Sequence, residues 1–282
     1  MKTEETPPTI AALAALSGQG PQLQVPSLVL LKAGTKSPSI FIAHGMGDTV
    51  MGLVQLASHL QVLHPIYGMQ ARGLDGLDDP LDRIEDMADF HLDTIRQVQA
   101  HGPYVLIGYS LGGLVTLEMA RRLSGDGEKI ALLAMLDSYP ERHHLPLGQH
   151  ARLVLRLAKM RAASFMQASG HQRRSEAGEN RSAHASDQPQ LDESTARARE
   201  RVKEYQDVAL RKYRPQFYDG KINFVKAAIP SFFPDDPAAV WAPLAKQFEI
   251  ETVPGDHLGI LTTQVENLAR VLSRYLGEAS LE

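Results

Sequence analysis

The chain has 282 residues, 43% hydrophobic and 22% charged, which are ordinary proportions for one large globular domain or two small ones. Its net charge of −4 gives no electrostatic case for binding nucleic acid or an anionic membrane, and the absence of cysteine excludes disulfides, thiolate zinc sites and a cysteine nucleophile. With no membrane-length apolar run and no signal-peptide pattern, the sequence predicts a cytoplasmic protein.

The first third of the chain alternates between strand-like and helix-like segments. Residues 1–24 are expected to form a tail or linker, which ends near a Gly-Gln-Gly-Pro break. After that break, the apolar pattern predicts strands at 27–31, 39–43 and 64–68, and helices at 50–60 and 84–99. Apolar residues and one histidine recur at helical spacing in the second helix: Ile84, Met87, His91, Ile95 and Val98.

Residues 104–113 carry the clearest chemical signal. A buried strand is predicted at 104–107, residues 108–112 fit Gly-x-Ser-x-Gly, and a helix is predicted at 114–123. This order is typical of a nucleophile elbow, a strained turn that exposes a reactive serine at the end of a sheet. The two glycines must lack side chains, because strand and helix would otherwise collide. We therefore expect Ser110 to be a nucleophile, facing the unpaired amides at the start of the next helix.

The second half contains further strands and one insertion. Strands are predicted at 130–136, 222–227 and 248–253, which with the earlier ones imply a mostly parallel sheet covered by helices on both faces. Between about 140 and 220 two amphipathic helices flank a polar stretch at 168–194 that holds almost no large apolar residues. We interpret this insertion as a lid with a mobile centre; a disordered loop without a gating role is the alternative.

A serine hydroxyl needs a base within hydrogen-bond reach and a third group that orients the base. His257 follows the last strand and precedes the last helix, the position at which an elbow serine finds its base. The acid is expected at Asp137, directly after the strand that follows the elbow. Asp235 and Asp236, which follow a later strand, are the alternatives.

An oxyanion that develops during acyl transfer needs two fixed hydrogen-bond donors. The backbone amide of Leu111 is expected to be one of them. The other is expected in the His-Gly-Met-Gly loop at 44–47, where Met46 is the first choice and Gly47 the second. His44 is expected to have a structural role.

Taken together, these stretches resemble a type I thioesterase domain of polyketide synthases and non-ribosomal peptide synthetases, within the α/β-hydrolase superfamily. Similar segments run from about residue 39 to residue 275, and include 41–47, 67–73, 102–112, 136–138, 205–213, 218–220 and 253–257. The resemblance implies an α/β-hydrolase fold over residues 25–282, with the lid at about 140–220. It also favours Asp137, because this family takes its acid from the strand after the elbow. The loop at 44–47 departs from the His-Pro-rich form of many members.

The resemblance further implies release of an acyl, polyketide or peptidyl chain from the phosphopantetheine of a carrier protein, by hydrolysis or cyclisation. The carrier protein is the implied partner, and no cofactor or metal of the chain's own is expected. Two other functions stay open: a general carboxylesterase or acyl-CoA hydrolase, and a non-catalytic binding protein of the same fold. Ser110, Asp137 and His257 together argue against the binding protein, which needs none of them.

Overall fold

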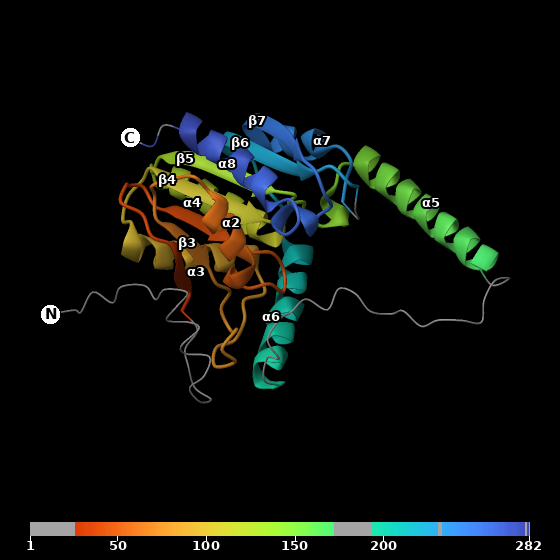
Figure 1. The fold of residues 1–282 in the computed structure, drawn as a ribbon, viewed down its shortest axis with the longest axis horizontal. Coiled ribbons are helices and arrows are strands. Elements are labelled where there is room, and N and C mark those ends of the chain that lie inside the picture. Colours follow the sequence, from red (N-terminus) through yellow and green to blue (C-terminus); the bar gives the residue numbers. More distant parts are fainter. Residues whose placement is uncertain (1–25, 172–192, 231–232, 280, 282) are drawn as a thin grey trace.

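A seven-stranded sheet forms the centre of the computed structural model, which describes residues 26–171, 193–230, 233–279 and 281 (Figure 1). The strands are β1 (Leu28–Lys32), β2 (Ile40–Ala43), β3 (Ile66–Met69), β4 (Tyr104–Tyr109), β5 (Ile130–Leu136), β6 (Tyr218–Ala227) and β7 (Ala245–Val253). Their order in the sheet is β1-β3-β2-β4-β5-β6-β7, and every pair is parallel except β1 with β3. The predicted mostly parallel sheet and its seven strands are confirmed, although β6 and β7 begin earlier than expected.

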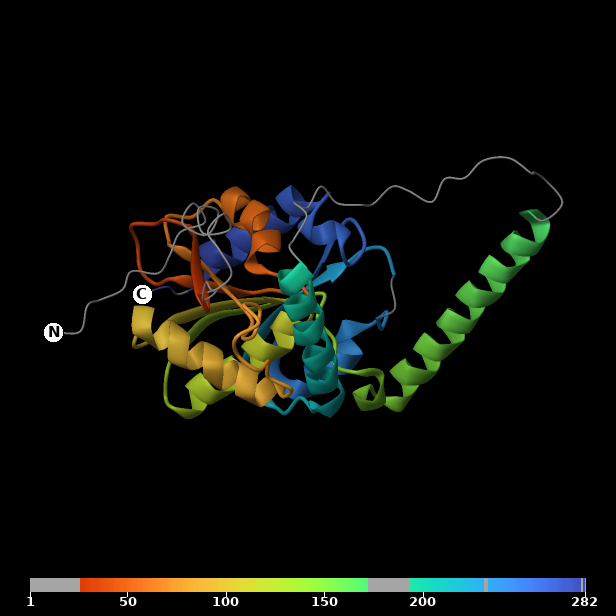
Figure 2. The ribbon, with the colours of Figure 1, turned by 90° about the horizontal axis from the view of Figure 1, so that it is seen from below.

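Helices cover both faces of the sheet (Figure 2). One face packs against α3 (Ile84–Val98) and α4 (Leu111–Gly125), and the other against α2 (Val54–His59) and α8 (Val265–Glu278). Shorter helices are η1 (Val50–Leu53), η2 (Arg142–His144), α7 (Pro237–Trp241), η3 (Ala242–Leu244) and η4 (Gly259–Leu261). No helix within the described ranges is both long and apolar enough to cross a membrane.

The insertion contains α5 (Leu147–His171) and α6 (Glu193–Lys212), so both of its predicted helices exist. In both views α5 extends away from the sheet, whereas α6 lies against the body of the protein (Figures 1 and 2). The side chains that α6 buries are Ala198, Val202, Gln206 and Ala209, a stripe that includes one polar residue. The expected tail and most of the polar stretch at 168–194 fall outside the described residues.

The parallel arrangement brings distant residues to one edge of the sheet. The carboxyl ends of β2, β4, β5 and β7 lead directly into residues 44–47, Ser110, Asp137 and the loop that carries His257. Ligands of open α/β sheets bind at this edge, outside the carboxyl ends of the strands. The fold thus gathers the predicted site residues from four separate parts of the chain.

Candidate active site

Ser110 sits on the sharp turn between β4 and α4, with φ 53° and ψ −120°. This positive φ is strained for a residue with a side chain. A Cβ on Gly108 would lie 2.3 Å from the Gly112 carbonyl oxygen, and one on Gly112 would lie 2.5 Å from the Ala43 carbonyl oxygen. The turn therefore closes only with glycine at both positions, as the motif predicted. The Ser138 hydroxyl holds it from outside by donating a 2.6 Å hydrogen bond to the Ser110 carbonyl.

Asp137 follows β5 and is also held at positive φ, 45°. Its backbone N–H donates to Val225 at 2.7 Å, and its Oδ1 accepts from the Ala227 N–H at 3.3 Å. The side chain is 4% exposed, and its Oδ2 lies 2.8 Å from His257 Nδ1. Strand β6 thus fixes the direction in which this carboxylate faces the histidine.

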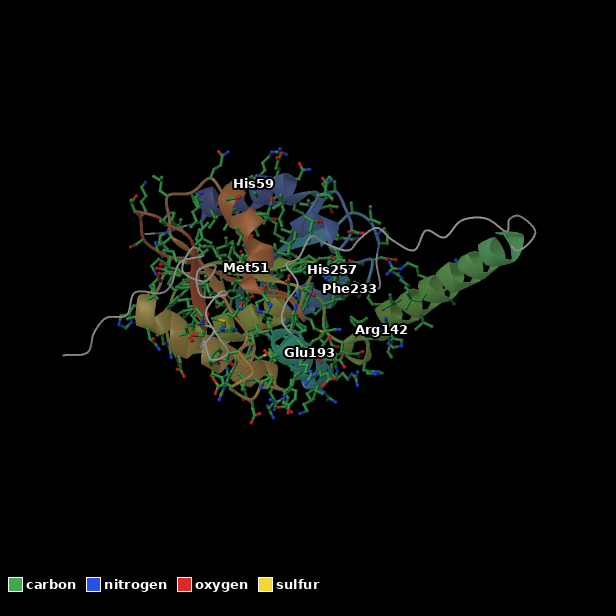
Figure 3. The ribbon with its side chains drawn as sticks, turned by 60° about the horizontal axis from the view of Figure 1, so that its bottom comes forward. Met51, His59, Arg142, Glu193, Phe233 and His257 are labelled. Carbon is green, nitrogen blue, oxygen red and sulfur yellow. The ribbon has the colours of Figure 1, made fainter. Side chains whose placement is uncertain are left out.

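His257 bridges the other two residues. Its Nδ1 faces Asp137, and its Nε2 lies 3.2 Å from the Ser110 Oγ. A proton on Nδ1, donated to the carboxylate, leaves Nε2 as an acceptor for the serine hydroxyl. The Phe233 ring lies 4.7 Å from the His257 ring, and the two residues are neighbours in Figure 3. Sequence reasoning missed Phe233, because its contact crosses between two loops that carry no periodic signal.

The other acidic residues near the site are engaged elsewhere. Asp235 forms an ion pair with Arg156. Asp236 accepts from the Ala239 N–H at 3.2 Å and caps α7, and Asp256 accepts from the Gly259 N–H at 2.7 Å. Of the acids considered from the sequence, Asp137 is the one whose carboxylate contacts His257 in the structure.

Two backbone amides are candidates for holding an oxyanion. Leu111 begins α4, and the first N–H groups of a helix have no partner within that helix. The loop at 44–47 lies beside the elbow, since a Cβ on Gly45 would lie 3.3 Å from the Ser110 Cβ. The Gly47 N–H already donates to Gln206 Oε1 at 2.7 Å, so the alternative assignment to Gly47 does not hold in this arrangement. Met46 is half-buried, and its N–H has no hydrogen-bond acceptor among the described residues.

His44 braces this loop from within. Its Nε2 accepts from the Ala71 N–H at 3.2 Å, so the proton of the neutral ring is on Nδ1, which donates to the Gly45 carbonyl at 2.7 Å. The Gly45 carbonyl and the Met46 N–H belong to one planar peptide, so holding the oxygen also orients the N–H. Burial lowers the pKa of His44, which favours this neutral form. Its structural role, expected from the sequence, is supported by both contacts.

A cavity of about 30 Å³ is lined by residues of α3, α4 and α6. Its walls include His44, Leu111, Gln206 and His91. His91 is 6% exposed, and its Nδ1 has no hydrogen-bond partner among the described residues. Burial lowers the pKa of His91 to about 3, so the ring is neutral at physiological pH.

No group of three or more metal-ligating side chains occurs in the described part of the chain.

The family model of the thioesterase domain matches residues 38–276. The chain is 38% identical over 143 residues to a dimodular nonribosomal peptide synthase of Bacillus subtilis (strain 168). The match covers 50% of this chain and 6% of the relative. It is 38% identical over 113 residues to the polyketide synthase PksR of the same organism, covering 40% of this chain and 4% of the relative. It thus spans only a small part of these relatives.

Among solved structures, the Vlm2 thioesterase domain bound with a dodecadepsipeptide is similar. The TM-score is 0.64 at 23% identity, and the match covers 88% of this chain and 96% of that domain. At this identity the similarity shows the fold alone, and that fold is the predicted α/β-hydrolase fold.

Proposed function

The chain belongs to the thioesterase domain family, and we propose that it releases an acyl or peptidyl chain from the phosphopantetheine thiol of a carrier protein. The observation that carries the proposal is the continuous contact path from Asp137 through His257 to Ser110, with distances of 2.8 and 3.2 Å. These are the spacings of an activated nucleophile, its base and the group that orients the base. The carrier partner and a cytoplasmic location remain predictions.

In the first half of the reaction, the Ser110 Oγ attacks the thioester carbonyl and passes its proton to His257 Nε2. Asp137 keeps the proton of Nδ1 in place and stabilises the imidazolium that forms. The amides of Leu111 and Met46 donate to the carbonyl oxygen as its negative charge develops. The C–S bond then breaks, leaving the chain on Ser110 as an ester. The departing thiolate, whose thiol has a pKa of about 8.5, leaves readily and takes up the proton from His257 Nε2, so the histidine is again neutral for the second half.

In the second half, a water molecule or a hydroxyl or amine of the bound chain attacks the ester. His257 takes the proton of this nucleophile and returns it to the Ser110 oxygen as the ester breaks. Water gives a free acid, and an internal nucleophile gives a ring. The extent to which α5 and α6 exclude water from the acyl-enzyme decides between the two products.

The test compares a carrier-bound acyl thioester with a p-nitrophenyl ester of the same acyl group. We expect a higher kcat/KM for the carrier-bound substrate, with Ser110→Ala inactive on both. A strong preference for the simple ester would instead indicate a general carboxylesterase. Mass spectrometry of the product distinguishes hydrolysis from cyclisation, because the acid is heavier than the ring by one water molecule.

A further inference from the structure

Side chains of α6 hold the loop at residues 44–47, which carries the Met46 amide, the second candidate oxyanion donor. Gln206 Oε1 accepts from the Gly47 N–H at 2.7 Å, and Arg199 Nε donates to the Gly47 carbonyl at 2.7 Å. Arg199 also lies 3.8 Å from the Asp48 carboxylate. Between these two side chains the stem of Lys203 closes over Gly47, where an added Cβ would lie 2.9 Å from its Cδ. Residues 199, 203 and 206 recur at helical spacing, so they share one face of α6.

These contacts bear on the Met46 amide. The Gly47 N–H belongs to the peptide that follows Met46, and the Gly45 carbonyl belongs to the peptide that precedes it. The first peptide is held by Gln206, while the second is held by His44 and by the Asp48 N–H, which donates to Gly45 at 3.3 Å. Gly47 itself has φ +67°, a conformation that a glycine reaches without strain. The Met46 N–H is therefore aimed by groups on both sides of it.

We propose that Gln206 and Arg199 are positioning residues for the oxyanion hole, so that α6 presents the Met46 amide to the reacting carbonyl. This inference rests on the proposed function, because it takes Met46 as an oxyanion donor. The helix then does more than cover the site. When α6 moves away from the loop, Gln206 and Arg199 no longer hold Gly47, and the oxyanion hole loses one of its two fixed donors.

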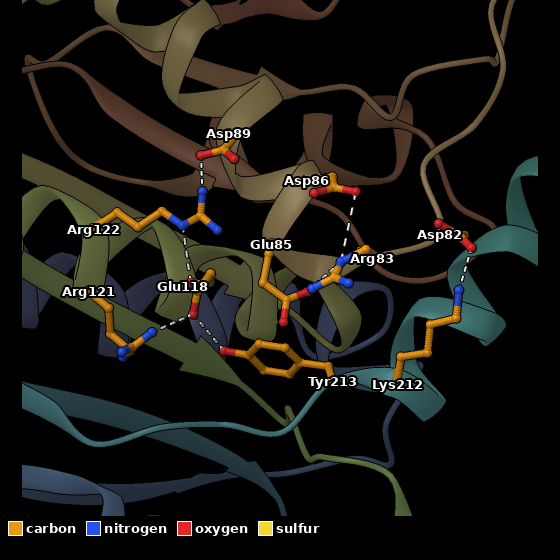
Figure 4. A network of polar contacts seen from close by, with 10 residues as sticks. All are labelled: Asp82, Arg83, Glu85, Asp86, Asp89, Glu118, Arg121, Arg122, Lys212 and Tyr213. Carbon is orange, nitrogen blue, oxygen red and sulfur yellow. Dashed lines mark hydrogen bonds and ion pairs between the residues drawn. The ribbon is translucent and has the colours of Figure 1, made fainter.

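The carboxyl-terminal end of α6 and Tyr213, which follows it directly, contact α4, the helix that supplies the other donor, and Asp82 in the loop before α3 (Figure 4). The Tyr213 hydroxyl donates to the Glu118 carboxylate at 3.2 Å, and Lys212 pairs with Asp82 at 2.5 Å. Glu118 is buried in α4 and also pairs with Arg121 and Arg122 (Figure 4). Because α4 begins at Leu111, the connected helices α4 and α6 together position the amides of Leu111 and Met46.

Loss of the contacts from Gln206 and Arg199 to Gly47 should weaken stabilisation of the transition state and leave substrate binding nearly unchanged. Removing an oxyanion donor outright lowers kcat by about 10²–10³-fold, so a donor that is present but poorly aimed should cost about 10- to 100-fold. KM should change by less than about twofold, because the neutral carbonyl of the bound substrate gains little from the hole.

The experiment compares Gln206→Met, which keeps the side-chain length but removes the acceptor, with Val202→Ala. Val202 is a matched control, because it lies one turn earlier on α6, is 1% exposed and makes no polar contact. Hydrolysis of p-nitrophenyl butyrate gives kcat and KM. Inhibition by phenylboronic acid, whose serine adduct is a tetrahedral anion, gives a second readout of the hole.

We expect Gln206→Met to lower kcat about 10- to 100-fold and to raise the Ki of the boronate by a similar factor. Val202→Ala should change neither by more than about threefold. Arg199→Met should act in the same direction as Gln206→Met, and it serves if the glutamine variant does not fold. An active wild type whose Gln206→Met variant matches Val202→Ala in both readouts would overturn the inference alone. A wild type that turns over neither this ester nor a carrier-bound acyl thioester, and does not bind the boronate, would overturn the proposed function and the inference together.

Discussion

The Tyr109 hydroxyl donates a 2.8 Å hydrogen bond to the backbone carbonyl of His257, so the residue before the nucleophile holds the loop of the base. The two rings also stack, with centroids 4.9 Å apart and planes at 23°. Burial raises the pKa of Tyr109, and the hydroxyl therefore stays protonated and able to donate. The elbow motif thus fixes the serine through its glycines and the histidine through its tyrosine.

Replacing Tyr109 with phenylalanine should lower kcat about fivefold, because it removes one hydrogen bond worth about 1 kcal/mol while keeping the stacked ring. Tyr104→Phe is the matched control. It removes a 3.0 Å hydrogen bond from a buried tyrosine of the same strand to the Gln99 carbonyl, at the end away from the site. The two variants should lose similar thermal stability, with kcat reduced only in Tyr109→Phe. Equal kcat in both would show that the hydroxyl does not help to place His257.

The Asp137→Asn variant should lower kcat by about 10⁴-fold, the magnitude found when an orienting acid becomes an amide. The amide can donate to Nδ1, which stabilises the wrong tautomer of His257 and leaves the serine without a base. Asp236→Asn is the control, because asparagine also caps helices and should keep α7 intact. Steady-state kinetics of both proteins decide the matter: a severe loss in Asp236→Asn with a mild one in Asp137→Asn would make Asp137 the wrong acid.

Substituting alanine for Gly112 should unfold or strongly destabilise the protein. The added Cβ would meet the Ala43 carbonyl oxygen at 2.5 Å, and two backbone segments cannot separate there without opening the elbow. We expect a loss of at least about 3 kcal/mol, or roughly 6–12 °C in Tm. Gly277→Ala is the counterpart in α8, where nothing lies within 4 Å of the new methyl group, and it should stabilise by up to about 1 kcal/mol. Comparable Tm values for the two variants would contradict the close approach at the elbow.

Stability should fall as the pH drops from about 6.5 towards 3, partly because of His91. Burial lowers the pKa of His91 to about 3 in the folded protein, from about 6.5 when unfolded, so the unfolded chain binds a proton that the folded chain refuses. This stability is present in full above pH 6.5 and is lost at up to about 1.4 kcal/mol per pH unit below it.

His91→Leu should therefore flatten the pH dependence of the urea midpoint between pH 6.5 and 4. It should not abolish that dependence, because burial also lowers the pKa of His44. The same slope in the variant and the wild type would mean that His91 is not buried in its neutral form.

The sequence contained enough to place the strands and the triad candidates, because apolar runs mark the strands and parallel strands bring their ends together. The bounds of β6 and β7 were less predictable. β7 is an edge strand in which Lys246, Gln247 and Glu249 are exposed, and the first residues of β6 pair only with β7. Neither strand therefore begins with an apolar run. The partners of a loop residue are harder still. Gln206 looks like a solvated position on a polar helix, and nothing in its spacing indicates that it meets Gly47, 159 residues earlier.

In the proposed mechanism, Ser110 is a nucleophile activated by His257 and Asp137. Labelling with a fluorophosphonate, followed by mass mapping of the modified peptide, tests it most directly. We predict one adduct, on Ser110, in the wild type, no adduct in Ser110→Ala, and greatly slowed labelling in Asp137→Asn. A wild type that resists labelling, or a Ser110→Ala variant that labels as fast as the wild type, would contradict the account.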